Sequence, residues 1–437
     1  RRNMRAAASN ICPRDNADLR PRRGAFSGAF NGAAVSVMQA IPILISTGKP
    51  TPWREINLTN VRWNYCAHLR YDGYLYSHVV RHTKMDFTLS PEQQMIYEYG
   101  ANVAQKYDYR YWLENARKNK FPEELWHQTA EDGFVGLMID EAYGGGGLGL
   151  LEMGLLVEGM SNNGLPLLMY VVGPTMALGH INMHGTEAQK SRYLPDAATG
   201  KSIFCFAITE SNAGSNSMRM QSLAKPDGNR FKLSGSKTFI TGADVSDYAV
   251  VVARTTPHDQ VKRKTDGFTV FIVDLKAKGV DMHALSMSVV NPEEQFTLFF
   301  DEVDLGPEDV LGEVGEGFKI LFDLLNPERV TIAAMACGVG RFAIEKAVAY
   351  TSERSVFNGP IGAYQGVQHP LAAAKTQIEL SSLMMRKAAA QFDLGEEAGP
   401  ASNMAKYAAA EAGIMAVDAA LQAHGGNGFT HEYGMYD

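Results

Sequence analysis

The chain changes its hydrophobic period twice, and this feature limits its possible folds more than any other. From Ser90 to about Gly200 apolar residues recur at helical spacing, as in S-P-E-Q-Q-M-I-Y-E-Y, whose serine can cap a helix. Between Ser202 and Gly312 the period falls to two, in β-rich runs such as Y-A-V-V-V-A and F-T-V-F-I-V. After Gly317 helical spacing returns with alanine-rich faces. This order predicts an α+β multidomain protein.

The two changes of period also mark the expected domain boundaries. We expect an all-α domain over residues 85–201, a small antiparallel β domain over 202–313, and a helical bundle over 314–437 that is incomplete at its end. The predicted bundle helices are Val330–Ser352, Pro370–Leu394 and Ala401–His424.

Residues 1–84 differ in charge from the rest of the chain. They carry a net charge of +9, which leaves −16 on the other residues. A mitochondrial-type transit segment is one interpretation, because the stretch is basic and poor in acids. The other is upstream sequence placed before a true start at Met85, and the tryptophans Trp53 and Trp63 favour it. Either way, we expect this segment to lie outside the fold.

Composition excludes several classes of protein. With 437 residues, 45% apolar and 20% charged, the chain is ordinary globular protein. Its four cysteines form no C-x-x-C pair, which argues against disulfides and structural zinc and favours a reducing compartment. Its charge-free stretches are interrupted by proline and glycine, so neither predicts a membrane span. The acidic body disfavours nucleic-acid binding, and we expect no metal site.

Two glycine-rich strings do not predict nucleotide sites. G-G-G-G-L-G, residues 144–149, fits a dinucleotide fingerprint but lacks a surrounding βαβ unit. The string that ends in T-G-K-S, residues 195–202, begins with proline and precedes a predicted strand, where a phosphate loop requires a helix.

Two strand ends in the β domain are better candidates for a binding site. The run Phe204–Asn216 leads from a strand into a turn of small residues, and Ser236–Gly242 ends in the same way. A flat heterocycle that lies across both strand ends could form hydrogen bonds with backbone groups and with Thr209 and Thr241. The alternative is a β-hairpin with ordinary turns.

Four strings in one order carry a family resemblance. They are A-I-T-E-S-N-A-G-S (207–215), K-T-F-I-T-G (237–242), E-R-S-V-F (353–357) with Gln365, and Q-A-H-G-G-N-G-F (422–429). Together they resemble the acyl-CoA dehydrogenase family, from about Met85 to the last residue. The resemblance implies a helical domain, a central antiparallel β-barrel and a C-terminal four-helix bundle.

The resemblance also implies site residues and partners. FAD is the implied cofactor, and an electron-transferring flavoprotein is the implied electron acceptor. A homo-oligomer, dimeric or tetrameric, is implied because some residues match positions that reach the FAD of a neighbouring subunit. Those residues are Arg354, Phe357, Gln365, Gln422 and Gly426. Positions that match FAD contacts within one subunit are Phe206, Ile208, Thr209, Gly214, Phe239, Ile240 and Thr241. Positions that match acyl-CoA contacts are Ser215, Asn326 and Arg329.

The expected catalytic base is Glu328, in L-L-N-P-E-R-V-T-I-A. The resemblance places the base of isovaleryl-CoA and long-chain types in such a Glu-Arg pair. Two alternatives stay open. Asn326 could cap a new helix with Pro327 at its first position, which would make Glu328 a first-turn acid, with the base beyond Asp437. The protein could also be catalytically silent.

We therefore expect an FAD-dependent enzyme that converts acyl-CoA thioesters to trans-2-enoyl-CoA. The alternatives are a flavin oxidase or monooxygenase on the same fold, and a silent FAD-binding assembly factor. The expected location is the bacterial cytoplasm, with the mitochondrial matrix as the alternative. The sequence does not indicate the length of the acyl chain, although Leu165–Val172 could influence pocket depth.

Overall fold

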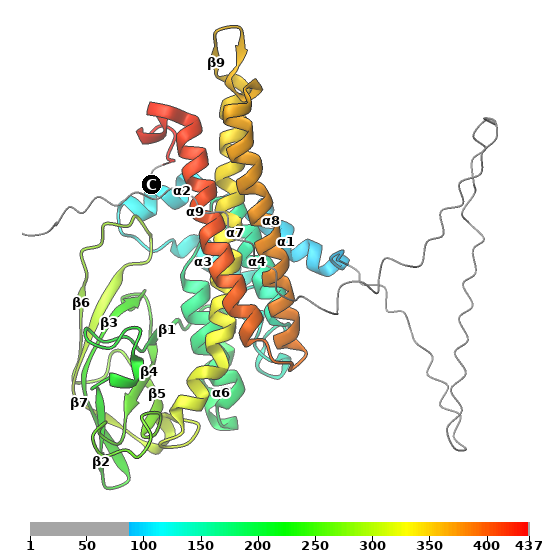
Figure 1. Ribbon diagram of the computed structural model, residues 1–437. Helices are drawn as coiled ribbons and strands as arrows, with labels where there is room; N and C mark the ends of the chain where they lie inside the picture. The colour runs from blue at the N-terminus through cyan, green and yellow to red at the C-terminus, as the bar shows by residue number, and fades with distance from the viewer. Residues whose placement is uncertain (1–86, 436–437) are drawn as a thin grey trace, which may run out of the picture. The chain divides into compact units, whose positions relative to one another are not determined.

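The computed structural model describes residues 87–435, so the predictions for residues 1–84 lie outside the described residues. The first part of the described chain is helical, as predicted (Figure 1). Its elements are α1 (Pro91–Val103), α2 (Tyr109–Arg117), α3 (Glu123–Glu131), α4 (Leu150–Asn162), the π-helical segment η3 (Val171–Leu178), α5 (Gly179–His184) and α6 (Glu187–Ala198).

The start and packing of α1 follow from its sequence. The Ser90 hydroxyl accepts a hydrogen bond from the Gln93 N–H at 3.1 Å, and the Gln93 side chain accepts one from the Ser90 N–H at 3.0 Å. This capping box confirms the predicted helix start. A Cβ at Gly100 would collide with the carbonyl of Gly159, so two glycines allow α1 and α4 to cross in close contact.

The central part is the predicted β domain, one sheet that does not close on itself, so it is a barrel only in a loose sense. Neighbouring strands follow the order β6-β7-β3-β2-β4-β5-β8, with β1 paired to β4. Most pairs are antiparallel, but β1 runs parallel to β4, as does the short pairing of β2 with β4. The strands are β1 (Phe204–Ala207), β2 (Leu223–Asp227), β3 (Arg230–Thr241), β4 (Tyr248–Arg254), β5 (Phe268–Asp274), β6 (Val280–Ala284), β7 (Gln295–Leu305) and β8 (Val310–Leu311).

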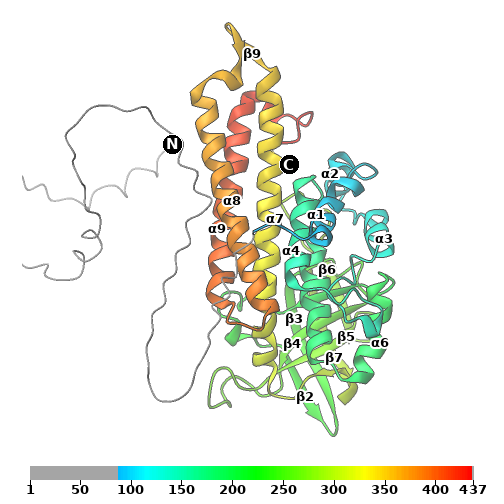
Figure 2. The same ribbon diagram turned by 90° about the vertical axis from the view of Figure 1, so that its right-hand side faces the viewer.

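Three long helices form the C-terminal part, and α4 packs beside two of them, α7 and α8 (Figure 2). They are α7 (Gly317–Glu353), α8 (Gln365–Asp393) and α9 (Gly399–His424). A short hairpin of β9 (Ser355–Val356) and β10 (Gly359–Pro360) joins α7 to α8. Small side chains at helical spacing form the contact face of α9, so the helices approach closely. These buried alanines are Ala405, Ala409, Ala412, Ala416 and Ala420.

The helix that carries Glu328 is continuous, so the alternative in which Asn326 caps a new helix is wrong. Pro327 lies inside α7, and its carbonyl accepts a hydrogen bond from the Thr331 hydroxyl at 2.9 Å. An internal proline costs about 3 kcal/mol. The helix continues because both flanking segments are packed, with Leu321 and Val330 buried before and after the proline. Glu328 is therefore in the body of a helix and is not a first-turn acid.

Candidate functional site

The ends of β1 and β3 meet, as the sequence predicts. The Thr238 N–H donates to the Thr209 carbonyl at 2.9 Å, which joins the two strand ends directly. The Lys237 ammonium donates to the Ile208 carbonyl, also at 2.9 Å. These bonds fix two of the segments that were expected to contact FAD.

A buried ion pair supports this junction. Lys237 is 0% exposed, and its Nζ lies 2.9 Å from Oε1 of Glu210. Burial lowers the pKa of Lys237 to about 8, although Glu210 opposes this shift. Burial alone would raise the pKa of Glu210. The Lys237 charge and the N–H groups of Gln221 and Ser222 outweigh it, so that pKa is lowered. The pair therefore stays ionised near neutral pH and connects the two strands.

Phe239 projects from an irregularity in β3. Lys237 pairs with Leu298 and Ile240 pairs with Phe296, so Thr238 and Phe239 together face the single residue between those partners. Such a bulge turns a side chain away from its regular direction. Phe239 has a φ of +58° and is 58% exposed. A left-handed, exposed aromatic residue is strained, and such strain is typical of ligand sites.

A cavity of about 410 Å³ lies beside this strand end. Gln295, which lines it, exchanges hydrogen bonds with the Thr241 hydroxyl at 3.0 and 3.1 Å. Met335 of α7 and Leu168, just before η3, are also in its wall. The cavity therefore adjoins the β3 end and the helix that carries Glu328. Leu168 belongs to the segment that was expected to influence pocket depth.

Glu328 is partly buried in α7. Burial raises the pKa of its carboxyl above the ordinary value of 4.5, while Arg329 and Lys406 oppose the shift. The Arg329 guanidinium donates to the Asn326 side chain at 3.0 Å. Asn326 precedes Arg329 by about one turn, so this bond holds the guanidinium against the preceding turn of α7. Residues four and seven positions after Glu328 share its helix face, so Met335 lies on that face. The Glu328 carboxyl and the cavity wall are thus on one side of α7.

A second group of predicted residues lies at the end of the bundle beside the β9 hairpin. Figures 1 and 2 show the β9 hairpin far from the sheet in both views. The Tyr350 ring stacks on His424 with centroids 4.3 Å apart, which brings the ends of α7 and α9 together. All five residues expected to reach a neighbouring FAD are at this end and exposed: Arg354, Phe357, Gln365, Gln422 and Gly426.

Phe357 is the most exposed member of this group. It is 95% exposed and has a φ of +55°. It therefore has the same unusual combination as Phe239, an exposed aromatic ring on left-handed backbone.

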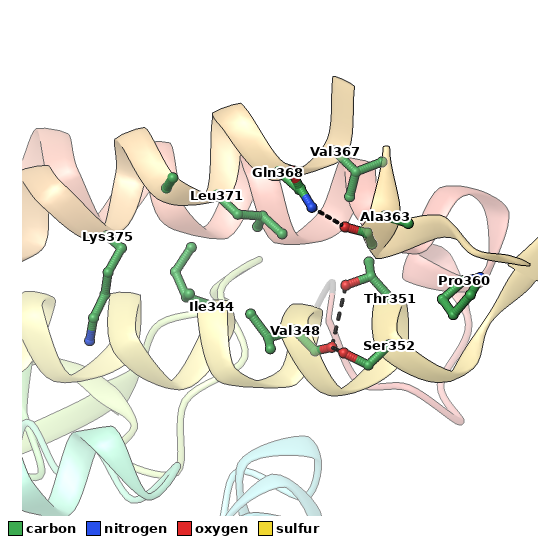
Figure 3. Close-up of a pocket in the computed structure, with 12 residues that line it drawn as sticks. Ile344, Val348, Thr351, Ser352, Pro360, Ala363, Val367, Gln368, Leu371 and Lys375 are labelled. Atoms are coloured by element: carbon green, nitrogen blue, oxygen red, sulfur yellow. Dashed lines mark hydrogen bonds between the residues drawn. The ribbon is translucent and has the colours of Figure 1, made fainter. Parts of the chain in front are cut away.

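A separate apolar cavity of about 550 Å³ lies between α7 and α8 near the hairpin. Figure 3 shows Ile344, Val348 and Leu371 facing it from the two helices. The Gln368 side chain donates to the Gly362 carbonyl at 2.8 Å, so its amide is engaged within the protein. No predicted site residue lines this cavity.

The other predicted residues have different surroundings. Phe206 and Ile240 are buried in the core, where Phe206 stacks on His180, so they can offer a ligand only backbone groups. Gly214 and Ser215 are exposed in the turn after β1.

Sequence reasoning missed four residues of the site, namely Lys237, Glu210, Glu293 and Gln295. Lys237 could have been found, because a lysine at an inward-facing position of a strand is unusual and indicates a buried partner. The Glu293-Glu294 pair follows Asn-Pro, which is typical of an exposed turn, so burial of Glu293 had no signal in the sequence.

These features fit the flat ring system of a flavin. Phe239 provides an exposed aromatic surface, and backbone groups and hydroxyls of Thr209 and Thr241 lie at the adjacent strand ends. Among residues 87–435 no three His, Cys, Asp or Glu side chains are placed to hold a metal ion. Within the same range no helix has the length and hydropathy of a membrane span. Fold and site define a protein that binds a flat aromatic cofactor.

Comparisons with known proteins agree with this class. The N-terminal, middle and C-terminal domain models of acyl-CoA dehydrogenases match residues 90–201, 205–303 and 315–437. Acyl-CoA dehydrogenase FadE12 of Mycobacterium tuberculosis is 41% identical over 355 residues, which cover 81% of this chain and 91% of that protein. A 3-(aryl)acrylate reductase of Clostridium sporogenes is 34% identical over 323 residues, which cover 72% and 83%.

The fold is also similar to solved structures. Butyryl-CoA dehydrogenase from Megasphaera elsdenii superposes with a TM-score of 0.76 at 28% identity, covering 80% of this chain and 92% of that one. The chain belongs to the acyl-CoA dehydrogenase family. It is an oxidoreductase of acyl-CoA thioesters, and its cofactor is FAD.

Proposed function

We propose that the chain dehydrogenates acyl-CoA thioesters to trans-2-enoyl-CoA with Glu328 as the base. The observation that carries this proposal is the surroundings of Glu328, a partly buried carboxyl in the body of α7 whose pKa is raised by burial. A carboxylate that is poorly hydrated is a stronger base, which suits it to removing a weakly acidic α proton.

The residues around Glu328 support this role. Arg329 and Lys406 favour the ionised form of the carboxyl and so limit the rise of its pKa. FAD, when bound, supplies the acceptor for the hydride that leaves the β carbon. Residues at the β1 and β3 ends, including Phe239 and Thr241, would hold its ring system.

The distribution of FAD residues supports a shared site. In one chain the β3 end lies by the cavity that Met335 lines, in the middle of α7, whereas Phe357 lies in the hairpin beyond the end of that helix (Figure 1). Both groups can contact one FAD only if a second chain supplies one of them. We therefore propose a homo-oligomer, with an electron-transferring flavoprotein as the electron acceptor.

Anaerobic mixing with acyl-CoA tests the proposed base. Glu328→Gln should still bind FAD and acyl-CoA, but bleaching of the flavin absorbance should slow by at least about 100-fold, because general-base catalysis contributes on that order. Glu345→Gln, an exposed position of the same helix, is the matched control and should bleach like the wild type. Fast bleaching by Glu328→Gln would reject Glu328 as the base.

A further inference from the structure

One carboxyl near the site has no part in the proposed reaction. Glu293 is 2% exposed and lines the 410 Å³ cavity beside the β3 end. Its Oε1 accepts from the Met169 N–H at 3.0 Å, and its Oε2 accepts from the Asn291 side chain at 2.8 Å. An ionised carboxylate has about four acceptor positions. Each oxygen thus has one hydrogen bond of regular geometry, and a donor on a ligand in the cavity would supply a further one.

Within residues 87–435 no cation forms an ion pair with this carboxyl. The side chains that line the cavity in the described part of the chain include Glu294 and Gln295 but no Lys, Arg or His. Burial raises the pKa of Glu293 to about 7, and the backbone N–H groups of Met169, Glu293 itself and Leu168, with the Asn291 side chain, only partly oppose the shift. The cavity is therefore acidic on one wall and would repel an anionic group. A hydroxyl suits it better, because it can donate to the carboxylate and accept from the neutral acid.

The other wall of the cavity is apolar. Met287, Leu285 and Leu168 line it, together with Met335 of α7. Flexible methionine side chains adapt to different apolar shapes and pack well against aromatic rings. The volume is within the usual range for a small-molecule site, which begins at about 300 Å³. An acyl group with an apolar body and one polar tip matches this division.

The position of the cavity relates it to the reaction. Met335 follows Glu328 by seven residues, which is two helical turns, or about 10 Å along α7. Gln295 connects the cavity to Thr241 at the proposed flavin site. The cavity thus lies on the same face of α7 as Glu328. It is displaced from Glu328 along the helix axis by about the length of a short acyl group.

We propose that this cavity receives the far end of the acyl group and that Glu293 selects substrates that carry a hydroxyl there. The inference rests on the proposed function, since it assumes that the thioester lies between Glu328 and the flavin. A hydroxylated aryl group is the ligand whose shape and polarity fit both walls.

Binding of a matched pair of thioesters tests the inference. The FAD-loaded full chain is titrated by calorimetry with 3-(4-hydroxyphenyl)propanoyl-CoA and 3-phenylpropanoyl-CoA, in the Glu328→Gln variant so that turnover does not interfere. We expect the hydroxylated thioester to bind about 10-fold more tightly, because a hydrogen bond to a charged group has roughly that effect. Equal affinities would overturn the inference.

Variants of the carboxyl give an independent readout. Glu293→Leu should abolish the preference, and Glu293→Gln, which keeps the shape and an acceptor for Met169, should reduce it at least about threefold. Glu313→Gln, at an exposed position that does not line the cavity, is the control and should keep the preference. Butyryl-CoA, which is too short to reach the cavity, should bind all variants alike. A preference that survives in a folded Glu293→Leu variant, or in Glu293→Gln if the leucine variant does not fold, contradicts the inference.

Flavin bleaching in the chain with intact Glu328 separates this inference from the proposed function. Bleaching by both thioesters at equal affinity overturns the inference and leaves the dehydrogenase function intact. Absence of bleaching by any of the acyl-CoAs overturns the proposed function, on which the inference rests.

Discussion

At the scale of single residues, the partly buried carboxyl of Glu328 and the buried carboxyl of Glu293 have different surroundings. Glu328 has two cations, Arg329 and Lys406, that favour its charge, whereas Glu293 has only neutral hydrogen-bond donors. The pKa of each is raised by burial, but the consequences differ. The neighbouring cations limit the rise of the pKa of Glu328, the proposed base, whereas Glu293, with a pKa of about 7, changes between acid and carboxylate near neutral pH.

The raised pKa of Glu328 predicts the pH dependence of the reaction. Only the carboxylate accepts a proton, so the rate of flavin bleaching should rise with pH and reach half of its maximum above pH 4.5, the ordinary value of the group. Stopped-flow absorbance between pH 4.5 and 8 measures this profile. A rate already at its maximum at pH 4.5 would contradict the predicted desolvation of the carboxyl.

Glu293 predicts a pH dependence of stability. Its pKa is about 7 in the folded chain and 4.5 in the reference state, so ionisation is harder in the folded protein. The neutral acid is favoured by folding, and stability falls as the pH rises from about 4.5 through 7. Glu293→Gln removes this loss. Its free energy of unfolding relative to wild type should increase by about 3 kcal/mol between pH 4.5 and 8. A constant difference, measured by urea unfolding, would contradict burial of an ionisable Glu293.

The sequence predicted these two residues unequally. Glu328 was found because it stands in a Glu-Arg pair that matches a family position. Glu293 was not found, because its burial depends on residues that are distant in sequence. One of them is Met169, whose N–H donates a hydrogen bond to the Glu293 carboxylate. Side-chain burial of this kind is a tertiary property.

At the scale of secondary-structure elements, the flavin site depends on how β1 and β3 are joined. The main connection is the buried pair of Lys237 and Glu210, supported by the bond between Thr238 and Thr209. A buried ion pair contributes little net stability, but removal of one partner leaves an uncompensated charge.

Removal of the lysine should therefore disturb the cofactor site. Lys237→Met leaves the Glu210 carboxylate buried without its cation, at a cost of about 3 to 5 kcal/mol. We expect FAD to bind at least about 10-fold more weakly, measured by flavin fluorescence. The double variant Lys237→Met with Glu210→Gln is the control and should be more stable than Lys237→Met alone. If the single and double variants have the same free energy of unfolding, the unpaired Glu210 charge is not the cause of the destabilisation.

The elements themselves were largely predictable. Hydrophobic period located the helices and the β domain, and the cap at Ser90 located the first helix. Two details that the sequence did not indicate have physical causes. Packing on both sides of Pro327 carries α7 through a residue that normally ends a helix. Closure of a sheet depends on which edge strands meet, which strand periodicity does not encode.

At the scale of the whole molecule, the predicted FAD contacts of one chain are divided between two places. The β3 end provides Phe239 and Thr241, and the end of the bundle provides Arg354 and Phe357. The two exposed aromatic rings on left-handed backbone are therefore explained together if each contacts an FAD, one in its own chain and one in a neighbour.

Mixed oligomers test this arrangement. Glu328→Gln removes the base from a chain's own site, and Arg354→Ala removes a contact to the neighbour's site. Each variant alone should have little or no dehydrogenase activity. Chains of both kinds, mixed at random as dimers, should recover about a quarter of wild-type activity per chain, because one of the two sites in each mixed dimer is intact. The oligomeric state is checked by light scattering. Absence of recovery in confirmed mixed dimers would exclude a shared site.

The central claim is that the Glu328 carboxylate removes the α proton. Incubation of the FAD-loaded enzyme with acyl-CoA in D2O, followed by mass spectrometry of the recovered thioester, measures this proton transfer directly. We predict deuterium at the α carbon with wild type and Glu345→Gln, and an exchange rate at least about 100-fold lower with Glu328→Gln. Equal exchange by Glu328→Gln and wild type would contradict the claim.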